Sequence, residues 1–275
     1  MDIEAAVARH YTQGSLAKTL LSALEAGGKD PDKLTIDDLS GIDEFHLGWS
    51  AATEELAEDL GFTPAMHVVE IGSGIGGPAR HLAHALGCTV TGVDLTPEFV
   101  EVADMLTRRC HLAGRVSFLQ ANALAMPFGA GRFDGAVMLH VGMNIADKPA
   151  LFKEVRRVLK PGARFGVYDI MHMAKGSLPY PMPWAMTSDT SFVEAPDHYR
   201  QALAKAGFTI ELERSLRDLA LKLSREMREK ATVDGPSPLG PQVLLGVSAP
   251  QRLANVMSAL AEGLIAPIEM IARAV

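Results

Sequence analysis

The stretch Val68-Val69-Glu70-Ile71-Gly72-Ser73-Gly74-Ile75-Gly76-Gly77-Pro78 decides the fold of this 275-residue chain. An apolar run ends in a glycine-rich turn, and Pro78 then opens a helix, because proline is favoured in the first helical turn. Glycines let backbone amides approach a ligand closely, and the free N–H groups of a helix N-terminus add positive potential. The stretch therefore predicts a ligand-binding turn between a buried strand and a helix.

Short apolar runs continue to alternate with helical segments along the chain. The predicted strands are Met66–Ile71, Thr89–Val93, Val116–Leu119, Gly135–Leu139 and Phe165–Tyr168, followed by Phe208–Leu212 and Ile268–Val275. A helix is expected near Asp197–Ala206. Strands that alternate with helices indicate an α/β fold with a doubly wound, largely parallel sheet.

The flanking segments are predominantly helical. Before the sheet we expect helices over Ile3–Ala26 and Ser50–Leu60, and before the last strand an insertion in which Leu216, Leu219, Leu223 and Met227 share one helical face. This organisation predicts four parts: an N-terminal helical cap (1–60), the core (61–214), a helical lid (215–265) and the final core strand (266–275).

The composition excludes several classes of partner. With a net charge of −7, no basic field is available for a nucleic acid backbone or an acidic membrane surface. Cys88 and Cys110 are too few for a disulfide framework and lie in no metal-binding spacing, so we expect no metal. Neither a signal peptide nor a run of roughly 18 apolar residues is found. We therefore expect a soluble, cytoplasmic protein, either a monomer or a homodimer.

The glycine turn suits two kinds of nucleoside cofactor. Gly72, Gly74 and Gly77 also satisfy the G-x-G-x-x-G spacing of dinucleotide sites. Glu70 favours S-adenosylmethionine over NAD, because a carboxylate there suits a cationic amino acid head group and sits poorly beside a pyrophosphate. Asp94, at the end of the second strand, can accept from ribose hydroxyls and is compatible with both cofactors.

Together these segments resemble the ordered motifs of class I S-adenosylmethionine-dependent methyltransferases. The matching segments are Glu70-x-Gly72-x-Gly74-x-Gly76, Asp94, Ala121-Asn122-Ala123-x-x-Met126-Pro127-Phe128, Phe133-Asp134-x-x-Val137 and Leu159-Lys160-Pro161-Gly162. Over residues 45–210 the chain is most similar to the ubiquinone and menaquinone methyltransferase branch, with sarcosine and dimethylglycine N-methyltransferases and the rebeccamycin sugar O-methyltransferase. The resemblance implies a seven-stranded sheet whose last strand is antiparallel.

The resemblance and the turn chemistry together define an expected cofactor site. Asn122 replaces the aspartate usual in the family after the third strand, and its amide oxygen can still accept from an adenine amino group, as an alternative to the Ala123 backbone. The expected cofactor-binding residues are Glu70, Gly72, Ser73, Gly74, Gly76, Gly77, Asp94, Leu95, Asn122, Ala123, Leu139 and His140.

The acceptor side is less well defined. His140 follows the fourth strand and is the candidate general base, with Asp169 after the fifth strand as its orienting partner, and the rebeccamycin-type enzyme has His and Asp at the matching positions. Packing roles for both remain open. Tyr11, His46, Asn144, His172 and Trp184 are candidate acceptor contacts. We expect methyl transfer to oxygen or nitrogen of a small molecule, with carbon methylation of a quinone-like acceptor as the alternative.

Overall fold

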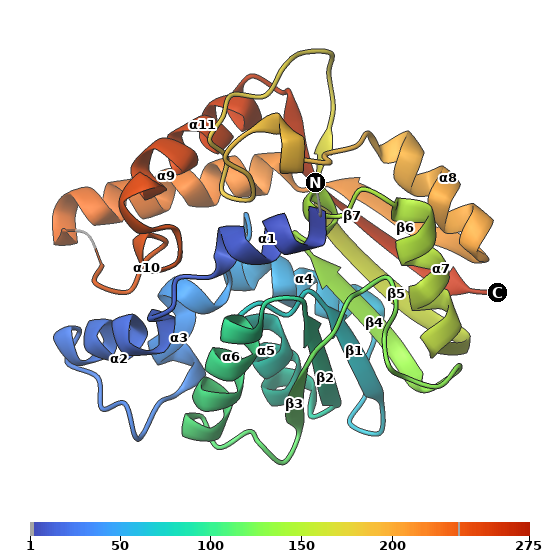
Figure 1. Ribbon diagram of the computed structural model, residues 1–275, viewed down its shortest axis with the longest axis horizontal. Helices are drawn as coiled ribbons and strands as arrows, with labels where there is room; N and C mark the ends of the chain where they lie inside the picture. Colours follow the sequence, from blue (N-terminus) through green and yellow to red (C-terminus); the bar gives the residue numbers. More distant parts are fainter. Residues whose placement is uncertain (1–2, 236) are drawn as a thin grey trace.

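A seven-stranded mixed sheet forms the centre of the molecule, as seen in the computed structural model, which describes residues 3–235 and 237–275 (Figure 1). The strand order is β3-β2-β1-β4-β5-β7-β6, and β7 alone runs antiparallel to its neighbours β5 and β6 within this described part. The strands are β1 His67–Ile71, β2 Thr89–Asp94, β3 Val116–Gln120, β4 Phe133–Leu139, β5 Leu159–His172, β6 Phe208–Ser215 and β7 Ile265–Ala274. The predicted fold class is confirmed.

Helices cover both faces of this sheet. On one face α4 (Trp49–Leu60) and α5 (Gly77–Leu86) bury their apolar rows against β1, β2 and β4. On the other face α7 (Lys148–Val158) and α8 (Pro196–Ala206) pack against β4 and β5. The helix α6 (Pro97–Arg109) lies along β2 and β3. Helix α4 belongs to the sheet packing, although the sequence placed residues 1–60 together in a cap.

The N-terminal region holds four helices where the sequence predicted two stretches. Helices α1 (Ile3–Tyr11) and α2 (Leu16–Ala26) divide the predicted Ile3–Ala26 helix, and α3 (Ile36–Asp43) was missed. The break has a physical cause: Gly14 has a φ of 75°, and the Glu98 carboxylate accepts the Gly14 N–H at 2.9 Å and the Leu16 N–H at 2.8 Å. This carboxylate on α6 takes the place of an N-cap for α2.

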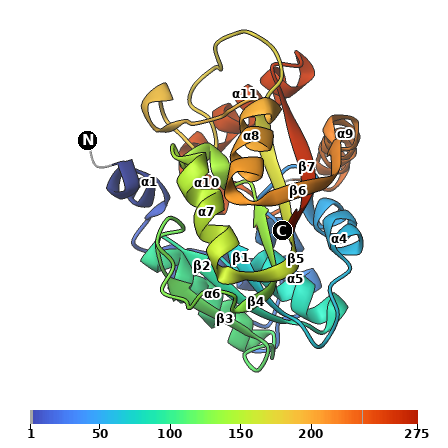
Figure 2. The same cartoon turned by 90° about the vertical axis from the view of Figure 1, so that its right-hand side faces the viewer.

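The insertion before β7 forms α9 (Arg217–Asp234), α10 (Gln242–Leu245) and α11 (Ala249–Ala261) (Figure 1). Helix α11 contacts α9 and α10, and Figure 2 shows α9 on the side of the molecule opposite α1. Its buried row is Leu216, Ala220 and Ser224, whereas Met227 of the predicted face is 43% exposed. Val243 of α10 shares a core with α2 and α3, so the lid and the cap pack on one another.

The fifth strand is longer than predicted. The sequence indicated Phe165–Tyr168, whereas β5 runs from Leu159 to His172 because β7 pairs with it from Arg164 to His172. Asp169 consequently lies inside β5 and not at its end. None of the described helices is both long and apolar enough to cross a bilayer.

Candidate active site

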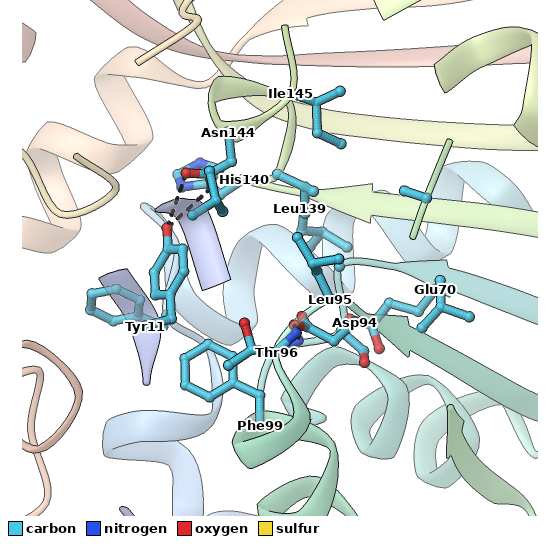
Figure 3. A pocket seen from close by; sticks show the side chains of 18 of the residues that line it. Tyr11, Glu70, Asp94, Leu95, Thr96, Phe99, Leu139, His140, Asn144 and Ile145 are labelled. Carbon is cyan, nitrogen blue, oxygen red and sulfur yellow. Dashed lines mark hydrogen bonds between the residues drawn. The ribbon is translucent and has the colours of Figure 1, made fainter. Parts of the chain in front are cut away.

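A cavity of about 330 Å³ opens at the carboxyl ends of β1, β2 and β4 (Figure 3). The strand order reverses between β1 and β4, and ligands of doubly wound sheets bind at such a switch point. Its walls come from the glycine turn after β1, the segments after β2, β3 and β4, and helices α1 and α10. The volume lies at the lower end of the range for small-molecule sites.

Gly74 offers its backbone to this cavity. It has a φ of 52°, and a Cβ built on it would meet no atom of the described residues within 4 Å, because that direction leads into the open cavity. Gly72 also lines the cavity with a φ of 67°, but a Cβ there would lie 2.4 Å from Val141. The backbone of Gly74 is therefore open to the cavity.

Gly76 and Gly77, which were also predicted to bind the cofactor, do not line the cavity. A Cβ on Gly76 would lie 2.4 Å from the Phe118 ring, and one on Gly77 would lie 1.8 Å from the backbone oxygen of Asp43. These two glycines instead allow α5 to pack closely against β3 and α3. The sequence motif alone does not distinguish glycines that face a ligand from those that pack against another strand or helix.

Five acidic residues line the cavity, among them Glu70 and Asp94 beside the glycine turn. Asp94 accepts the backbone N–H groups of Gly74 and Thr96, each at 2.8 Å. Glu70 is 2% exposed, and within the described structure its Oε2 atom has no hydrogen-bond partner. Burial, reinforced by the charges of Glu44 and Asp94, raises the pKa of Glu70 well above its usual value. The site therefore suits a cationic ligand group next to Glu70.

The far wall of the cavity is mostly apolar. Leu95, Phe99 and Leu124 line it together with Ala123 and Ile145. Asn122 also lines the cavity, but its Oδ1 atom already accepts the Leu124 N–H at 2.9 Å. This turn occupies one lone pair of the oxygen that the sequence analysis assigned to adenine. The Asn122 amide N–H group and the Ala123 backbone remain available to a heteroaromatic ring.

His140 lies where the cavity meets a second pocket. Its backbone adopts a φ of 53°, and its N–H donates to the Tyr168 carbonyl at 2.7 Å. The imidazole stacks on the Tyr168 ring at 5.1 Å between centroids. Its buried Nε2 atom has no partner among the residues that the structure describes. Burial, and then the charge of His46, lower the pKa of His140 well below its usual value, so the ring is uncharged at neutral pH.

A buried cluster lies beside His140, in which the predicted acceptor residue His46 meets Glu44 and Thr53, two residues that the sequence analysis missed. The Nε2 atom of His46 lies 2.8 Å from the Glu44 carboxylate and 3.1 Å from the Thr53 hydroxyl, which itself donates to Glu44 at 2.8 Å. The Nδ1 atom of His46 lies 3.4 Å from the Leu47 carbonyl. The ring centroid of His46 lies 5.6 Å from that of His140.

Asp169 does not orient His140. Its carboxylate accepts the Tyr199 hydroxyl at 2.6 Å and the Ile170 N–H at 3.0 Å, and it lines neither pocket. Burial raises the pKa of Asp169 to about 6. The prediction failed because β5 continues beyond Asp169 and its side chain points to the α8 face of the sheet, where it supports the turn at Gly142.

A second, smaller pocket of about 90 Å³ adjoins the first. Three of the predicted acceptor residues, Tyr11, His46 and Trp184, line it, and Asn144 lines the first cavity, where its Nδ2 atom donates to the Tyr11 hydroxyl at 3.1 Å (Figure 3). His172 lines neither pocket. The remaining lining residues are Phe45, Leu47, Trp49, His140, Met143, Ile170, Pro183, Pro241, Leu253 and Val256.

The two pockets share the residues at their junction. Tyr11, Phe45, His46 and His140 line both, so a molecule in the smaller pocket would contact one in the larger. The smaller pocket draws its walls from the α3–α4 segment, the loop at Pro183 and Trp184, and the lid. Among the described residues, no group of three or more His, Cys, Asp or Glu side chains is arranged to hold a metal ion.

Comparison with known proteins agrees with this geometry. Residues 69–167 match the family model of the methyltransferase domain, which covers β1 to the middle of β5. A sterol 24-C-methyltransferase of Gibberella zeae is 34% identical over 114 residues, which are 42% of this chain and 30% of that protein. An O-methyltransferase of Aspergillus sclerotiorum is 25% identical over 200 residues, covering 71% of this chain and 74% of that protein. The chain thus spans about a third of the first relative's length.

The fold extends over the whole chain. A solved structure of a geranyl diphosphate methyltransferase in complex with GPP and sinefungin superposes with a TM-score of 0.71 at 18% identity, covering 99% of this chain and 100% of that one. The sheet, the cap and the lid therefore all belong to one known architecture. The similarity to the methyltransferase domain family lies in residues 69–167, where the sequence motifs predicted it.

Proposed function

We propose that this chain is an S-adenosylmethionine-dependent methyltransferase that methylates an oxygen or nitrogen atom of a small molecule. The observation that carries the proposal is that Glu70 and Asp94 line the same cavity as the open backbone of Gly74. An ammonium group would pair with the partnerless Oε2 atom of Glu70, and ribose hydroxyls would donate to Asp94. Among these relatives the finer assignment to the ubiquinone and menaquinone branch remains a prediction.

The site fits the methyl donor in its remaining parts as well. The apolar walls at Leu95, Phe99 and Ile145 can enclose the adenine ring. Pyrophosphate, by contrast, would face two carboxylates without a basic side chain in the described lining of the cavity other than histidine. These charges support S-adenosylmethionine over NAD. When bound, the donor supplies an electrophilic methyl group on a sulfonium.

The smaller pocket is the proposed acceptor site. Methyl transfer is an in-line displacement, so the protein must align the acceptor with the donor and exclude water. The aromatic and aliphatic walls at Trp49, Met143 and Trp184 exclude water and hold an apolar body. Tyr11 and Asn144, joined by a hydrogen bond, connect the cap to the segment after β4 above the junction.

His140 is the proposed proton acceptor for a hydroxyl. Its uncharged ring and partnerless Nε2 atom are at the junction of the two pockets. Burial, and then the neighbouring His46, lower the pKa of His140 and so favour its uncharged ring. Asp169 has no part in this proposal.

Carbon methylation is the second candidate. The acceptor pocket is lined mostly by apolar side chains, and relatives that act on carbon include the sterol enzyme of Gibberella zeae. A carbon acceptor loses a proton before or after it receives the methyl group, so it also needs a base, whereas an amine that is already neutral does not. The bond formed to the transferred methyl group, read from the labelled product, distinguishes the two candidates.

The proposal is tested by a thermal-shift panel and a transfer assay. A ligand at about 100 times its dissociation constant stabilises by roughly 2.7 kcal/mol, so S-adenosylhomocysteine should raise the melting temperature and NAD should not. A metabolite mixture incubated with the labelled methyl donor should then yield a labelled product. Stabilisation by NAD alone would contradict the assigned cofactor, and cofactor binding without any labelled product would contradict the assigned activity.

A further inference from the structure

Arg252 in the lid is a buried cation without a carboxylate partner. It is 8% exposed, and no Asp or Glu oxygen of the described residues lies within 4 Å of it. Its Nη2 atom contacts the Met186 thioether at 2.8 Å, and its Nη1 atom lies 3.4 Å from His10 Nε2. Its buried Nε atom has no partner in the described part of the chain.

These contacts compensate the charge poorly. A thioether is a weak acceptor. His10 Nε2 also lies 3.1 Å from the Pro183 carbonyl, so it cannot donate to that oxygen and accept from Arg252 at the same time. A buried charge is costly unless it is paired and hydrogen-bonded. The surroundings of Arg252 therefore lack the group that its guanidinium requires.

Arg80 shows how this chain satisfies a guanidinium that serves structure. It is 0% exposed, and it donates to the Asp43 carboxylate, the Thr107 hydroxyl and the carbonyls of Ile75 and Ala103. Every nitrogen of Arg80 has a partner, one of them an anion. Arg252 has neither property, although both side chains are more than nine-tenths buried.

Helix stability does not explain Arg252 either. It stands at the end of the first turn of α11, Ala249–Ala261, where the helix dipole disfavours a positive charge. Residues close to Arg252 line the acceptor pocket. They are Leu253 and Val256 on the same helix, together with Pro183 and Tyr11. Arg252 itself lines neither pocket, but its guanidinium contacts His10, the residue next to Tyr11, which lines both.

We propose that Arg252 binds an anionic oxygen group, a carboxylate or a phosphate, at the end of the acceptor away from the methyl-receiving atom. The inference rests on the proposed function, because it assigns the smaller pocket to the acceptor. An acceptor with its apolar body against Trp49 and Trp184 and its reactive atom near His140 would extend beyond the lining of the smaller pocket to reach Arg252 with its anionic end. A planar guanidinium suits both carboxylate and phosphate through paired N–H donors.

Matched small probes test this subsite without knowledge of the natural acceptor. Trp49 and Trp184 are the only tryptophans of the sequence and both line the pocket, so their fluorescence reports its occupancy. The protein saturated with S-adenosylhomocysteine is titrated with hexanoate, hexyl phosphate, hexanol and hexylamine. We expect at least one of the two anions to bind about tenfold to a hundredfold more tightly than hexanol. The better anion identifies the group.

Variants separate a binding role from a structural role. Arg252→Gln should remove the preference for the anion and leave the affinity for hexanol unchanged, whereas Arg252→Lys should keep part of the preference. The exposed lid residue Arg228 provides the matched control, and Arg228→Gln should behave as the parent. Arg252→Met should keep or raise the melting temperature, because it removes a charge that lacks a partner.

Equal binding of hexanoate, hexyl phosphate and hexanol would overturn the proposal. So would an anion preference that survives in Arg252→Gln, or a large loss of melting temperature in Arg252→Met. The binding of S-adenosylhomocysteine is measured first in each protein. If that binding is absent from the parent, the proposed function fails; if it is present and the anion preference is absent, only the Arg252 subsite fails.

Discussion

Replacing Glu70 with glutamine removes the charge that we expect to hold the donor's ammonium group while keeping the shape of the side chain. Glu70 is 2% exposed on β1, and its Oε2 atom has no protein partner in the structure as described. One charge-assisted hydrogen bond contributes about 1.5–3 kcal/mol. Glu70→Gln should therefore weaken the binding of S-adenosylhomocysteine by roughly 10-fold to 150-fold.

The affinity should also depend on pH through this residue. Because burial and the charges of Glu44 and Asp94 raise its pKa, Glu70 binds a proton in the free protein over a range where an exposed glutamate does not. A cationic group binds the ionised form, so complex formation releases that proton. The association constant should rise by up to about tenfold per pH unit below the raised pKa, and this slope should vanish in Glu70→Gln.

Stability should change with pH in the opposite direction in the free protein. A carboxyl group whose folded pKa is raised contributes stability that is fully present below its unfolded value of 4.5 and is lost as the pH rises through the folded pKa. Glu70→Gln should therefore gain stability relative to the parent as the pH rises. Bound S-adenosylhomocysteine should stabilise the parent more at high pH than at low pH.

Titration calorimetry between pH 6 and 8.5, in pairs of buffers with different ionisation enthalpies, measures both the affinity and the released proton. Glu54→Gln, an exposed position on α4, is the matched control and should bind as the parent does. If Glu70→Gln binds within twofold of the parent and shows the same pH slope, the assignment of Glu70 to the cationic head group is refuted.

The other predictions concern the glycine turn, the base, a buried ion pair and the cap. Gly74→Val should abolish binding of S-adenosylhomocysteine in calorimetry while the circular dichroism spectrum is retained, since its Cβ would enter the cavity. For a hydroxyl acceptor, His140→Ala should lower kcat by roughly 10²–10⁴-fold. It should also remove a rising limb of the pH–rate profile below pH 6.5, and an unchanged limb would contradict the role of His140 as the base. Asp43→Asn leaves the buried Arg80 without its anion and should lower the free energy of unfolding in urea by about 3–5 kcal/mol, with a loss below 1 kcal/mol contradicting this account. Amides of α1 should exchange hydrogen more slowly when S-adenosylhomocysteine is bound, and unchanged exchange would count against closure by the cap.

The pattern of the sequence was sufficient for the sheet and for part of the site. Short apolar runs bounded by turn residues predict parallel strands, and carboxyl-end positions in such a sheet converge by topology. This reasoning located Glu70, Gly74, Asp94 and His140 at one cavity. It failed for Asp169 because the length of β5 depends on its pairing with β7, which no local pattern of β5 reveals.

The sequence by itself determined the α/β architecture, the glycine turn and the charge of the nucleoside site, because each depends on residues close together in the chain. Only the tertiary structure decided which side chains from distant parts of the sequence contact one another. It paired Glu44 with His46 beside His140, assigned Gly76 and Gly77 to helix packing, and placed Arg252 next to His10 across 242 positions of sequence. Such contacts form because the cap and the lid pack on the sheet. The burial of a side chain and its hydrogen-bond partners therefore depend on that packing and not on the local sequence.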